Sequence, residues 1–280
     1  MKRILFGILC GCLLSLSTQG QLLWRVSGPS MFQPSYLFGT FHLTCKDQFW
    51  VDDSVRVALK QVKGLVLELN MRDPALMSDF IQSSRLPAGT TLLQDWPNTK
   101  KDSFSVALKQ QYKLDAKNYE TLQPMVLMSA LYPKILNCPT ASYELFLMEE
   151  AQKLQLSLAG LEKASDQMKA MGRIPLSKQM ESVYQMVLDP AHSKKEFDEL
   201  WQLYQTKRIE ELFVKTSEDP QLGAYQEYLL DERNRNWVDI LPTMMAEKPV
   251  FIAVGAGHLG GKQGVIRLLR AKGYRVEPVN

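Results

Sequence analysis

Residues 250–258 read V-F-I-A-V-G-A-G-H, an apolar run that breaks at Gly255 and reaches His258. Residues 36–42 read Y-L-F-G-T-F-H, a second apolar run that breaks at Gly39 and reaches His42 with the same spacing. The chain has only 3 histidines, so this shared G-x-x-H pattern is informative. Ligands and catalytic groups gather at strand ends in α/β sheets, and imidazole is both a common metal ligand and the usual acid–base group near neutral pH. The pair predicts one composite site built from both ends of the chain.

Hydrophobic spacing around these two runs predicts strands and helices at each end of the chain. The N-terminal part reads as two strands, a helix and a buried strand, at 22–26, 35–39, 52–63 and 65–69. The C-terminal part reads as a strand, a glycine-rich loop, a helix and a strand, at 249–254, 255–261, 263–272 and 274–278. We therefore expect an α/β fold with a central mixed β-sheet formed by N- and C-terminal βαβ-like units.

A large helical insertion is expected between the two ends, from about residue 77 to residue 245. It contains one further strand at 158–162 and a helical stretch that opens at Thr90-Thr91-Leu92. Its other predicted helices cover 122–136, 142–154, 178–188, 194–203, 209–214 and 224–242.

Residues 1–20 are typical of a secretory signal peptide. Lys2 and Arg3 precede an apolar stretch at 4–16, and small residues at 18–20 suit cleavage before Gln21. A lipoprotein signal that uses Cys12 is the alternative. Elsewhere the chain has no apolar stretch of the ~18 residues that a membrane helix needs. We therefore expect an exported protein, periplasmic or secreted, with no membrane span in the mature chain and a single domain over residues 21–280.

Composition narrows the partners and the redox state. Loss of Lys2 and Arg3 with the signal lowers the formal net charge from +3 to +1, which argues against binding to nucleic acid. Two cysteines remain, Cys45 and Cys138, and an exported pair is a disulfide candidate. The alternative is that Cys45, three residues after His42, belongs to the site as a thiolate or a metal ligand.

Two glutamates lie in predicted strands, where a buried carboxylate needs a partner. Glu68 lies in L-V-L-E-L and is a candidate metal ligand or general base beside His42. The alternative is a strand-end residue that faces solvent or forms a salt bridge with Arg72. Glu162 lies in L-A-G-L-E and is a second candidate, with Lys163 as its alternative partner.

The remaining polar motifs are weaker. Arg233 and Asn234, in D-E-R-N-R-N-W, suit a cluster that holds an oxyanion or a carboxylate, although such runs are usually solvated helix faces. His192, in D-P-A-H-S-K, is expected at the surface. Residues 255–260 also spell G-x-G-x-x-G, but too little chain follows to complete a dinucleotide-binding unit. No G-x-S-x-G or H-E-x-x-H motif is present.

On these residues the chain resembles the TraB/GumN family, which includes the TIKI metalloproteases. The resemblance rests on five elements in order along the mature chain: the two G-x-x-H motifs at 39–42 and 255–258, Glu68, G-L-E at 160–162 and E-R-N at 232–234. It implies a divalent-metal-dependent peptidase or related hydrolase. Mn²⁺ or Co²⁺ is the metal that the resemblance suggests, with Zn²⁺ as an alternative.

Together these observations predict that His42, Glu68 and His258 bind a divalent cation that activates water for amide hydrolysis of a peptide or protein. Glu162 is expected to act as a base or as an orienting group, and Arg233 and Asn234 to hold the substrate or an oxyanion. The competing hypothesis is a binding protein of the same fold, which holds a peptide, haem or metal without turnover.

Overall fold

The computed structural model describes residues 20–218 and 223–279, so the predicted signal peptide, apart from Gly20, lies outside the described residues. A six-stranded sheet in the order β6-β4-β7-β2-β1-β8 forms the centre of the fold. Its strands are β1 (Leu23–Ser27), β2 (Ser35–Thr40), β4 (Gly64–Leu69), β6 (Ser157–Glu162), β7 (Val250–Gly255) and β8 (Arg275–Pro278). The expected α/β fold with a mixed central sheet is confirmed.

Four strands of this sheet run parallel. β7 pairs with β2 on one side and with β4 on the other, and β4 pairs with β6. All six residues of β2 and all six of β7 are buried, as expected for central parallel strands covered on both faces. β1 is antiparallel to β2, and β8 is antiparallel to β1. The C-terminal strand therefore does not pair with β7, unlike the next strand of a dinucleotide-binding unit.

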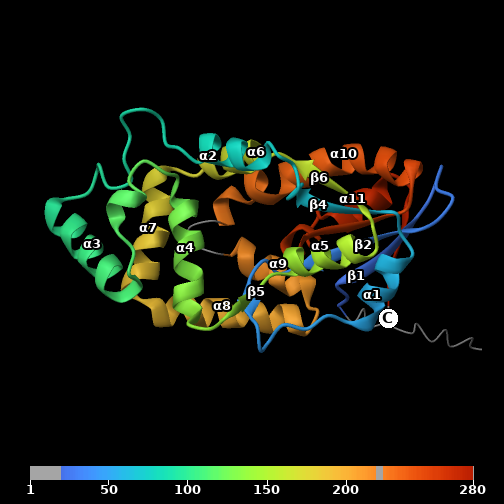
Figure 1. Cartoon of the computed structure of the whole chain (residues 1–280), viewed down its shortest axis with the longest axis horizontal. Coiled ribbons are helices and arrows are strands. Elements are labelled where there is room, and N and C mark those ends of the chain that lie inside the picture. Colours follow the sequence, from blue (N-terminus) through green and yellow to red (C-terminus); the bar gives the residue numbers. More distant parts are fainter. Residues whose placement is uncertain (1–19, 219–222, 280) are drawn as a thin grey trace, which may run out of the picture.

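Helices surround the sheet and extend away from it, and Figure 1 shows α3, α4 and α7 at the end of the molecule remote from the sheet. The described α-helices are α1 (Asp53–Lys60), α2 (Leu76–Ser83), α3 (Asn98–Tyr112), α4 (Pro124–Leu136), α5 (Tyr143–Lys153), α6 (Ala164–Gly172), α7 (Leu176–Leu188), α8 (Pro190–Gln205), α9 (Ile209–Ser217), α10 (Glu232–Glu247) and α11 (Val265–Ala271). Short 3-10 turns lie at Ala116–Asn118 (η1), Gly223–Tyr225 (η2) and Ala256–His258 (η4), and a π-helical turn, η3, covers Glu227–Asp231.

The expected helical insertion is present, with its own hydrophobic cluster. Phe104, Leu108, Leu131 and Val183, from α3, α4 and α7, are among its buried side chains. The larger cluster packs around the sheet. One expectation is wrong: no helix opens at Thr90, and α3 begins at Asn98. The reason is Pro97, because the residue before a proline is disfavoured in the helical conformation.

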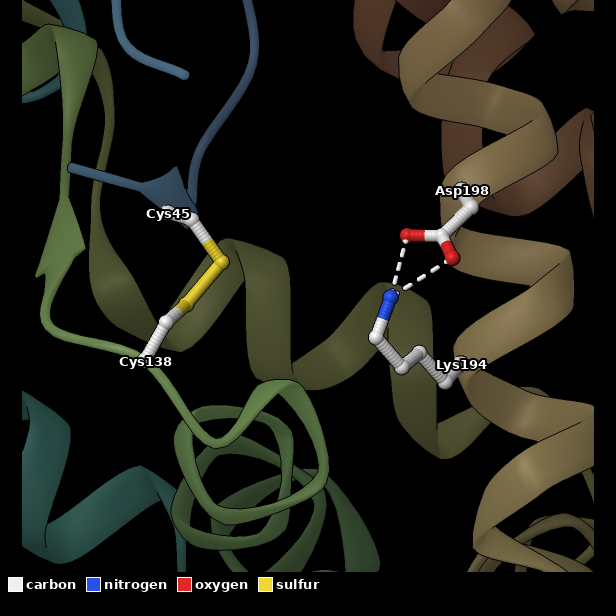
Figure 2. The surroundings of a disulfide bond; sticks show 4 residues. All are labelled: Cys45, Cys138, Lys194 and Asp198. Carbon is white, nitrogen blue, oxygen red and sulfur yellow. Dashed lines mark hydrogen bonds and ion pairs between the residues drawn. A yellow bond between two sulfur atoms is a disulfide. The ribbon is translucent and has the colours of Figure 1, made fainter. Parts of the chain in front are cut away.

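A disulfide joins Cys45 to Cys138, as predicted, so the alternative of a Cys45 thiolate is excluded in this structure. Figure 2 shows the bond linking β3 (Thr44–Cys45) to the segment just before β5 (Thr140–Ala141). These two short strands pair antiparallel beside the bond. The disulfide therefore fixes the loop that carries His42 against the segment that leads into α5.

Removal of this disulfide is expected to lower stability substantially. The double variant Cys45→Ser/Cys138→Ser should reduce the free energy of unfolding by about 2–4 kcal/mol, because the bond closes a long loop in the unfolded chain. Urea unfolding followed by circular dichroism measures the change. An unfolding midpoint equal to that of the wild type would contradict the prediction.

Among the residues that the structure describes, no helix is both long and apolar enough to cross a membrane.

Candidate functional site

The carboxyl ends of the four parallel strands meet at one edge of the sheet, and the candidate residues gather there. Glu162 ends β6, and Glu68 lies one residue before the end of β4. His258 lies in η4, directly after β7, and His42 lies two residues after β2. Because Thr40 pairs with Gly255, the two G-x-x-H turns leave the sheet side by side.

The two motif glycines have steric roles at this edge. A Cβ on Gly39 would lie 2.8 Å from the Leu259 side chain and 3.2 Å from Ala256, so glycine lets the first turn approach η4. A Cβ on Gly255 would lie 3.2 Å from His42 Nε2 and 3.4 Å from Glu68 Oε1. Those two atoms therefore border the same small space above Gly255.

His42 is oriented by Glu144, at the start of α5. Its Nδ1 lies 2.9 Å from Glu144 Oε1. The carboxylate also accepts hydrogen bonds from Thr40 Oγ1 at 2.7 Å and from Ser142 Oγ at 2.8 Å. Because Nδ1 is hydrogen-bonded to Glu144, the second ring nitrogen of His42 faces the space above Gly255. The His42 side chain is 66% exposed.

His258 is oriented by Asn234, on α10, in the same way. Its Nδ1 lies 2.6 Å from Asn234 Oδ1. The amide nitrogen of Asn234 donates to the Gln263 carbonyl at 2.9 Å, so Oδ1 is the acceptor and His258 Nδ1 carries the proton. Nε2 of His258 is then an acceptor, and it lies 3.2 Å from Arg233 Nη1. In each imidazole, Nδ1 thus forms a hydrogen bond with an oxygen atom of the protein, and Nε2 faces the site.

Arg233 connects the carboxylates of β4 and the edge strand β6. Its Nη2 lies 2.7 Å from Glu68 Oε2 and 2.5 Å from Glu162 Oε1. Its Nε donates to Glu162, and its Nη1 donates to the Leu229 carbonyl at 2.8 Å and reaches His258. Five N–H groups are all that a guanidinium offers. Arg233 therefore directs its full set of donors at protein groups.

Three further contacts complete this buried network. Glu68 Oε1 accepts the backbone N–H of Gly255 at 2.8 Å, and Glu68 Oε2 accepts from Gln167 Nε2 at 3.1 Å. Trp237 Nε1 donates to Glu162 Oε2 at 3.1 Å, and the indole ring lies under the Arg233 guanidinium. The Glu162 side chain is only 6% exposed, so both of its oxygens face protein donors.

The π-helical turn η3 positions Arg233. It supplies the Leu229 carbonyl and continues directly into α10, which carries Arg233 and Asn234 in its first turn and Trp237 in its second. Such π-helical turns within helices recur at functional sites.

Electrostatics distinguish the two histidines. Desolvation opposes the charged form of His42, but the hydrogen bond to Glu144 and the charges of Glu144 and Glu68 raise its pKa to about 9. Because most of this ring faces solvent, the direct bond to Glu144 decides the direction. Burial and the charge of Arg233 lower the pKa of His258 to about 3, so this ring is neutral.

Glu68 is held in its charged form. Burial opposes ionisation, but the charges of His258, Arg233 and His42 and the Gly255 N–H together lower the pKa of Glu68 to about 2. Because His258 is neutral at physiological pH, Arg233 is the permanent cation beside this carboxylate. A neutral imidazole, an ionised carboxylate and an arginine thus lie together at this edge of the sheet.

A family model described as the TraB/PrgY/gumN family matches residues 22–278. The chain belongs to this family. Its similarity to individual TraB/PrgY/gumN-like proteins is distant. It is 22% identical to metalloprotease TIKI2 of Danio rerio over 96% of this chain and 62% of that protein. It is 23% identical to metalloprotease TIKI1 of Homo sapiens over 87% of this chain and 59% of that protein.

The chain spans about three fifths of the length of the curated relatives that it matches. Metalloprotease TIKI1 of Danio rerio is 22% identical over 87% of this chain. No solved structure matches the chain significantly. These relatives are metalloproteases by name.

The sequence-based candidates all lie at this edge of the sheet, but with partners that the sequence did not indicate. Glu68 pairs with Arg233, whereas Arg72 donates to Gln152. Glu162 likewise pairs with Arg233 and not with Lys163. His192 lies at the surface on α8, as expected, where it pairs with Glu196.

Sequence reasoning missed Glu144, Gln167 and Trp237. Trp237 follows Arg233 by four residues on one helix, a spacing that places both on the same face and offered a signal. Glu144 is next but one to the N-cap Ser142 of α5, but only the fold brings it to His42. Gln167 gave no signal in the sequence.

Within residues 20–218 and 223–279, no group of three or more His, Cys, Asp or Glu side chains is arranged so that it could hold a metal ion. At this edge the Arg233 guanidinium instead contacts His258 Nε2 and both glutamates.

Proposed function

We propose that the chain is an exported, divalent-metal-dependent hydrolase that cleaves amide bonds in peptides or proteins. Its single domain would cover residues 21–280 after removal of the signal peptide. The observation that carries the proposal is the matched orientation of two imidazoles beside an ionised carboxylate. His42 and His258 each bond an oxygen acceptor through Nδ1 and turn Nε2 toward the edge where Glu68 lies.

The residue types and ring orientations support a divalent cation, whereas the present arrangement around Arg233 is not that of a metal site. Metal-bound histidines in proteins usually donate their second ring N–H to a carboxylate or another oxygen, as His42 and His258 do here. His258 Nε2 and Glu68 Oε1 lie 3.9 Å apart. Two ligands that share one ion at ~2.0–2.2 Å each lie at most ~4.4 Å apart, so this separation is compatible with a shared ion. His42, Glu68 and His258 would hold the ion, with Mn²⁺ or Co²⁺ suggested by the family resemblance and Zn²⁺ as the alternative.

When bound, such an ion would polarise the scissile carbonyl and lower the pKa of a water molecule. The role of the surrounding residues follows from their contacts. Arg233 is shared by Glu68 and Glu162 and offsets part of their charge when no cation is present, and it occupies the lone pair of His258 Nε2. A ligating His258 requires the Arg233 N–H to move away from that nitrogen. We therefore assign Arg233 to charge balance and positioning.

Glu162 and Asn234 receive positioning roles for the same reason. Both oxygens of Glu162 accept bonds from Arg233 or Trp237, so this carboxylate orients its neighbours rather than reaching a substrate. Asn234 holds the tautomer of His258.

The contacts of Arg233 also support a second candidate function. A protein in which an arginine keeps its site charge-balanced without an ion could bind a ligand without turnover. A metal-dependent hydrolase needs an open coordination position for water, which a pure binding protein does not need. Metal content and turnover therefore separate the two functions.

The test combines metal analysis with peptide cleavage. The mature protein is purified, and its metal content is measured before and after dialysis against Mn²⁺, Co²⁺ or Zn²⁺. The three loaded forms and the chelated form are then incubated with a peptide library and analysed by mass spectrometry. We expect about one ion per chain, since three ligands form one site, and cleavage that is lost on chelation. Tight binding of peptide without cleavage by any loaded form would favour the binding protein.

Glu144 provides a narrower prediction within the proposed function. Glu144→Gln keeps a hydrogen bond to His42 Nδ1 but removes the charge that orients the ring. Outer-shell changes of this kind usually reduce metal affinity or activity by ~10–100-fold, and we expect a loss in that range. The control is Glu149→Gln, an exposed glutamate on the same helix. Metal titration and kcat/KM are measured for both, and equal values would contradict the orienting role.

A further inference from the structure

A groove of about 810 Å³ lies between α2, α4, α6 and α7, in the helical insertion. Its floor includes the buried side chains of Met168 and Ile174 and the partly buried Leu86 and Leu176. None of the residues discussed at the sheet edge lines this groove.

The charged residues that line the groove are all basic. Arg85, Lys169 and Arg173 are exposed on its rim, and no aspartate or glutamate is among the lining residues. Within the described chain, neither arginine forms an ion pair with a carboxylate, whereas Lys169 lies 3.7 Å from the exposed Asp166. The nearby carboxylate of Asp79 accepts a backbone N–H of α6. The rim therefore carries excess positive charge around an apolar floor.

The base of the groove also has hydrogen-bond acceptors without donors. Gln179 is 5% exposed, and its amide nitrogen donates to the carbonyls of Met171 and Ile174. Within the described residues its Oε1 has no partner, and neither has Oε1 of Gln123, which also lines the groove. Both oxygens are shielded from the groove surface, so the basic rim and the apolar floor are the features that select a ligand. An acidic peptide offers carboxylates for the rim and apolar side chains for the floor.

Two segments of the chain connect the groove with the candidate site. Gln167, which donates to Glu68, lies on α6 next to the lining residues Met168 and Lys169. Arg173, at the end of the same helix, lies over the ring of Tyr228, in the π-helical turn that holds Arg233. Five helical residues from Gln167 to the end of α6 rise ~7.5 Å. Two to four extended residues at ~3.3 Å each cover such a distance.

We propose that this groove binds an acidic segment of the peptide substrate, a few residues from the bond that is cleaved. The inference rests on the proposed peptidase function and adds a substrate class to it. The carboxylates of the segment would pair with Arg85, Lys169 and Arg173, and its apolar side chains would cover Met168 and Ile174.

The first experiment measures binding without turnover. A fluorescein-labelled peptide of alternating alanine and glutamate is titrated with the metal-free mature protein at low salt, beside glutamine and lysine versions of the same peptide. We expect binding of the glutamate peptide to weaken about tenfold in Arg85→Gln/Lys169→Gln/Arg173→Gln, as three exposed ion pairs would give. The control Arg25→Gln/Lys60→Gln/Lys109→Gln removes the same charge from exposed positions outside the groove and should bind like the wild type.

Two results would overturn the groove assignment. One is equal weakening in the groove variant and in the control, which would mean that only net charge matters. The other is displacement of the peptide by inorganic phosphate well beyond that by sodium chloride of equal ionic strength, which would indicate a simple anion site.

The second experiment separates this inference from the proposed function. The metal-loaded protein is assayed with peptides that carry glutamate at successive distances from a common cleavable bond. The groove variant should raise KM about tenfold for the preferred peptide and leave kcat unchanged, because the changed residues lie outside the reacting centre. If cleavage depends neither on the position of the glutamates nor on the three rim residues, the groove assignment is wrong and the peptidase function is unaffected. Groove-dependent binding with no cleavage of any peptide would overturn the peptidase and leave the acidic-peptide site.

Discussion

Glu68→Gln is expected to lower kcat/KM for peptide hydrolysis by ~10²–10³-fold, the scale seen when a group that stabilises charge in the transition state is removed. Glutamine keeps the size of the side chain but removes the negative charge of the carboxylate that the proposal makes a metal ligand. The Gly255 N–H can still donate to the remaining carbonyl oxygen. Steady-state kinetics and metal titration are measured together, since loss of a ligand should weaken metal binding as well as turnover.

The matched control is Glu150→Gln. Glu150 is another partly buried glutamate, on α5, and its partners Arg56 and Lys153 lie outside the site. Circular dichroism and thermal unfolding show whether both variants keep the fold. A Glu68 variant that retains the activity of the Glu150 variant would remove Glu68 from the catalytic machinery.

The strand ends were predictable because their signals are local. An unbroken apolar run predicts a buried parallel strand, and a glycine followed by a histidine marks its end. Both G-x-x-H turns therefore lie where the sequence indicated, and Glu68 is conspicuous as a charge inside an apolar run. The role of the glycines required the structure, because a Cβ at Gly255 would meet atoms of His42 and Glu68 that come from other strands.

The partners of these residues were not predictable because they come from elements far away in the sequence. Glu144 reaches His42 only because α5 begins beside β3, where the disulfide joins the two segments. The E-R-N run indicated a polar cluster, but which partner each of its residues contacts depends on the geometry of the helix. Arg233 bonds the two glutamates while Asn234, the next residue, bonds His258. Neighbours on a helix point in directions ~100° apart, so adjacent residues can serve different partners.

Arg233→Met is expected to lower the free energy of unfolding by about 3–5 kcal/mol, the range found when one partner of a buried ion pair is removed. Methionine retains much of the aliphatic length over Trp237 but leaves Glu68 and Glu162 without their shared cation. Both carboxylates are largely buried, at 11% and 6% exposure, so solvent compensates them poorly. Urea unfolding of the metal-free protein, followed by circular dichroism, measures the loss.

Two further variants decide whether the buried charges are the cause. Arg235→Met, two residues further along α10, removes an exposed pair with Glu227 and should change stability by less than ~1 kcal/mol. Adding Glu162→Gln to Arg233→Met should recover part of the loss, because only one uncompensated carboxylate then remains beside His258. If Arg233→Met cost no more than Arg235→Met, or if Glu162→Gln made it worse, the balance of charge at this sheet edge would not depend on Arg233. The positioning role proposed for it would then fail even with the peptidase activity intact.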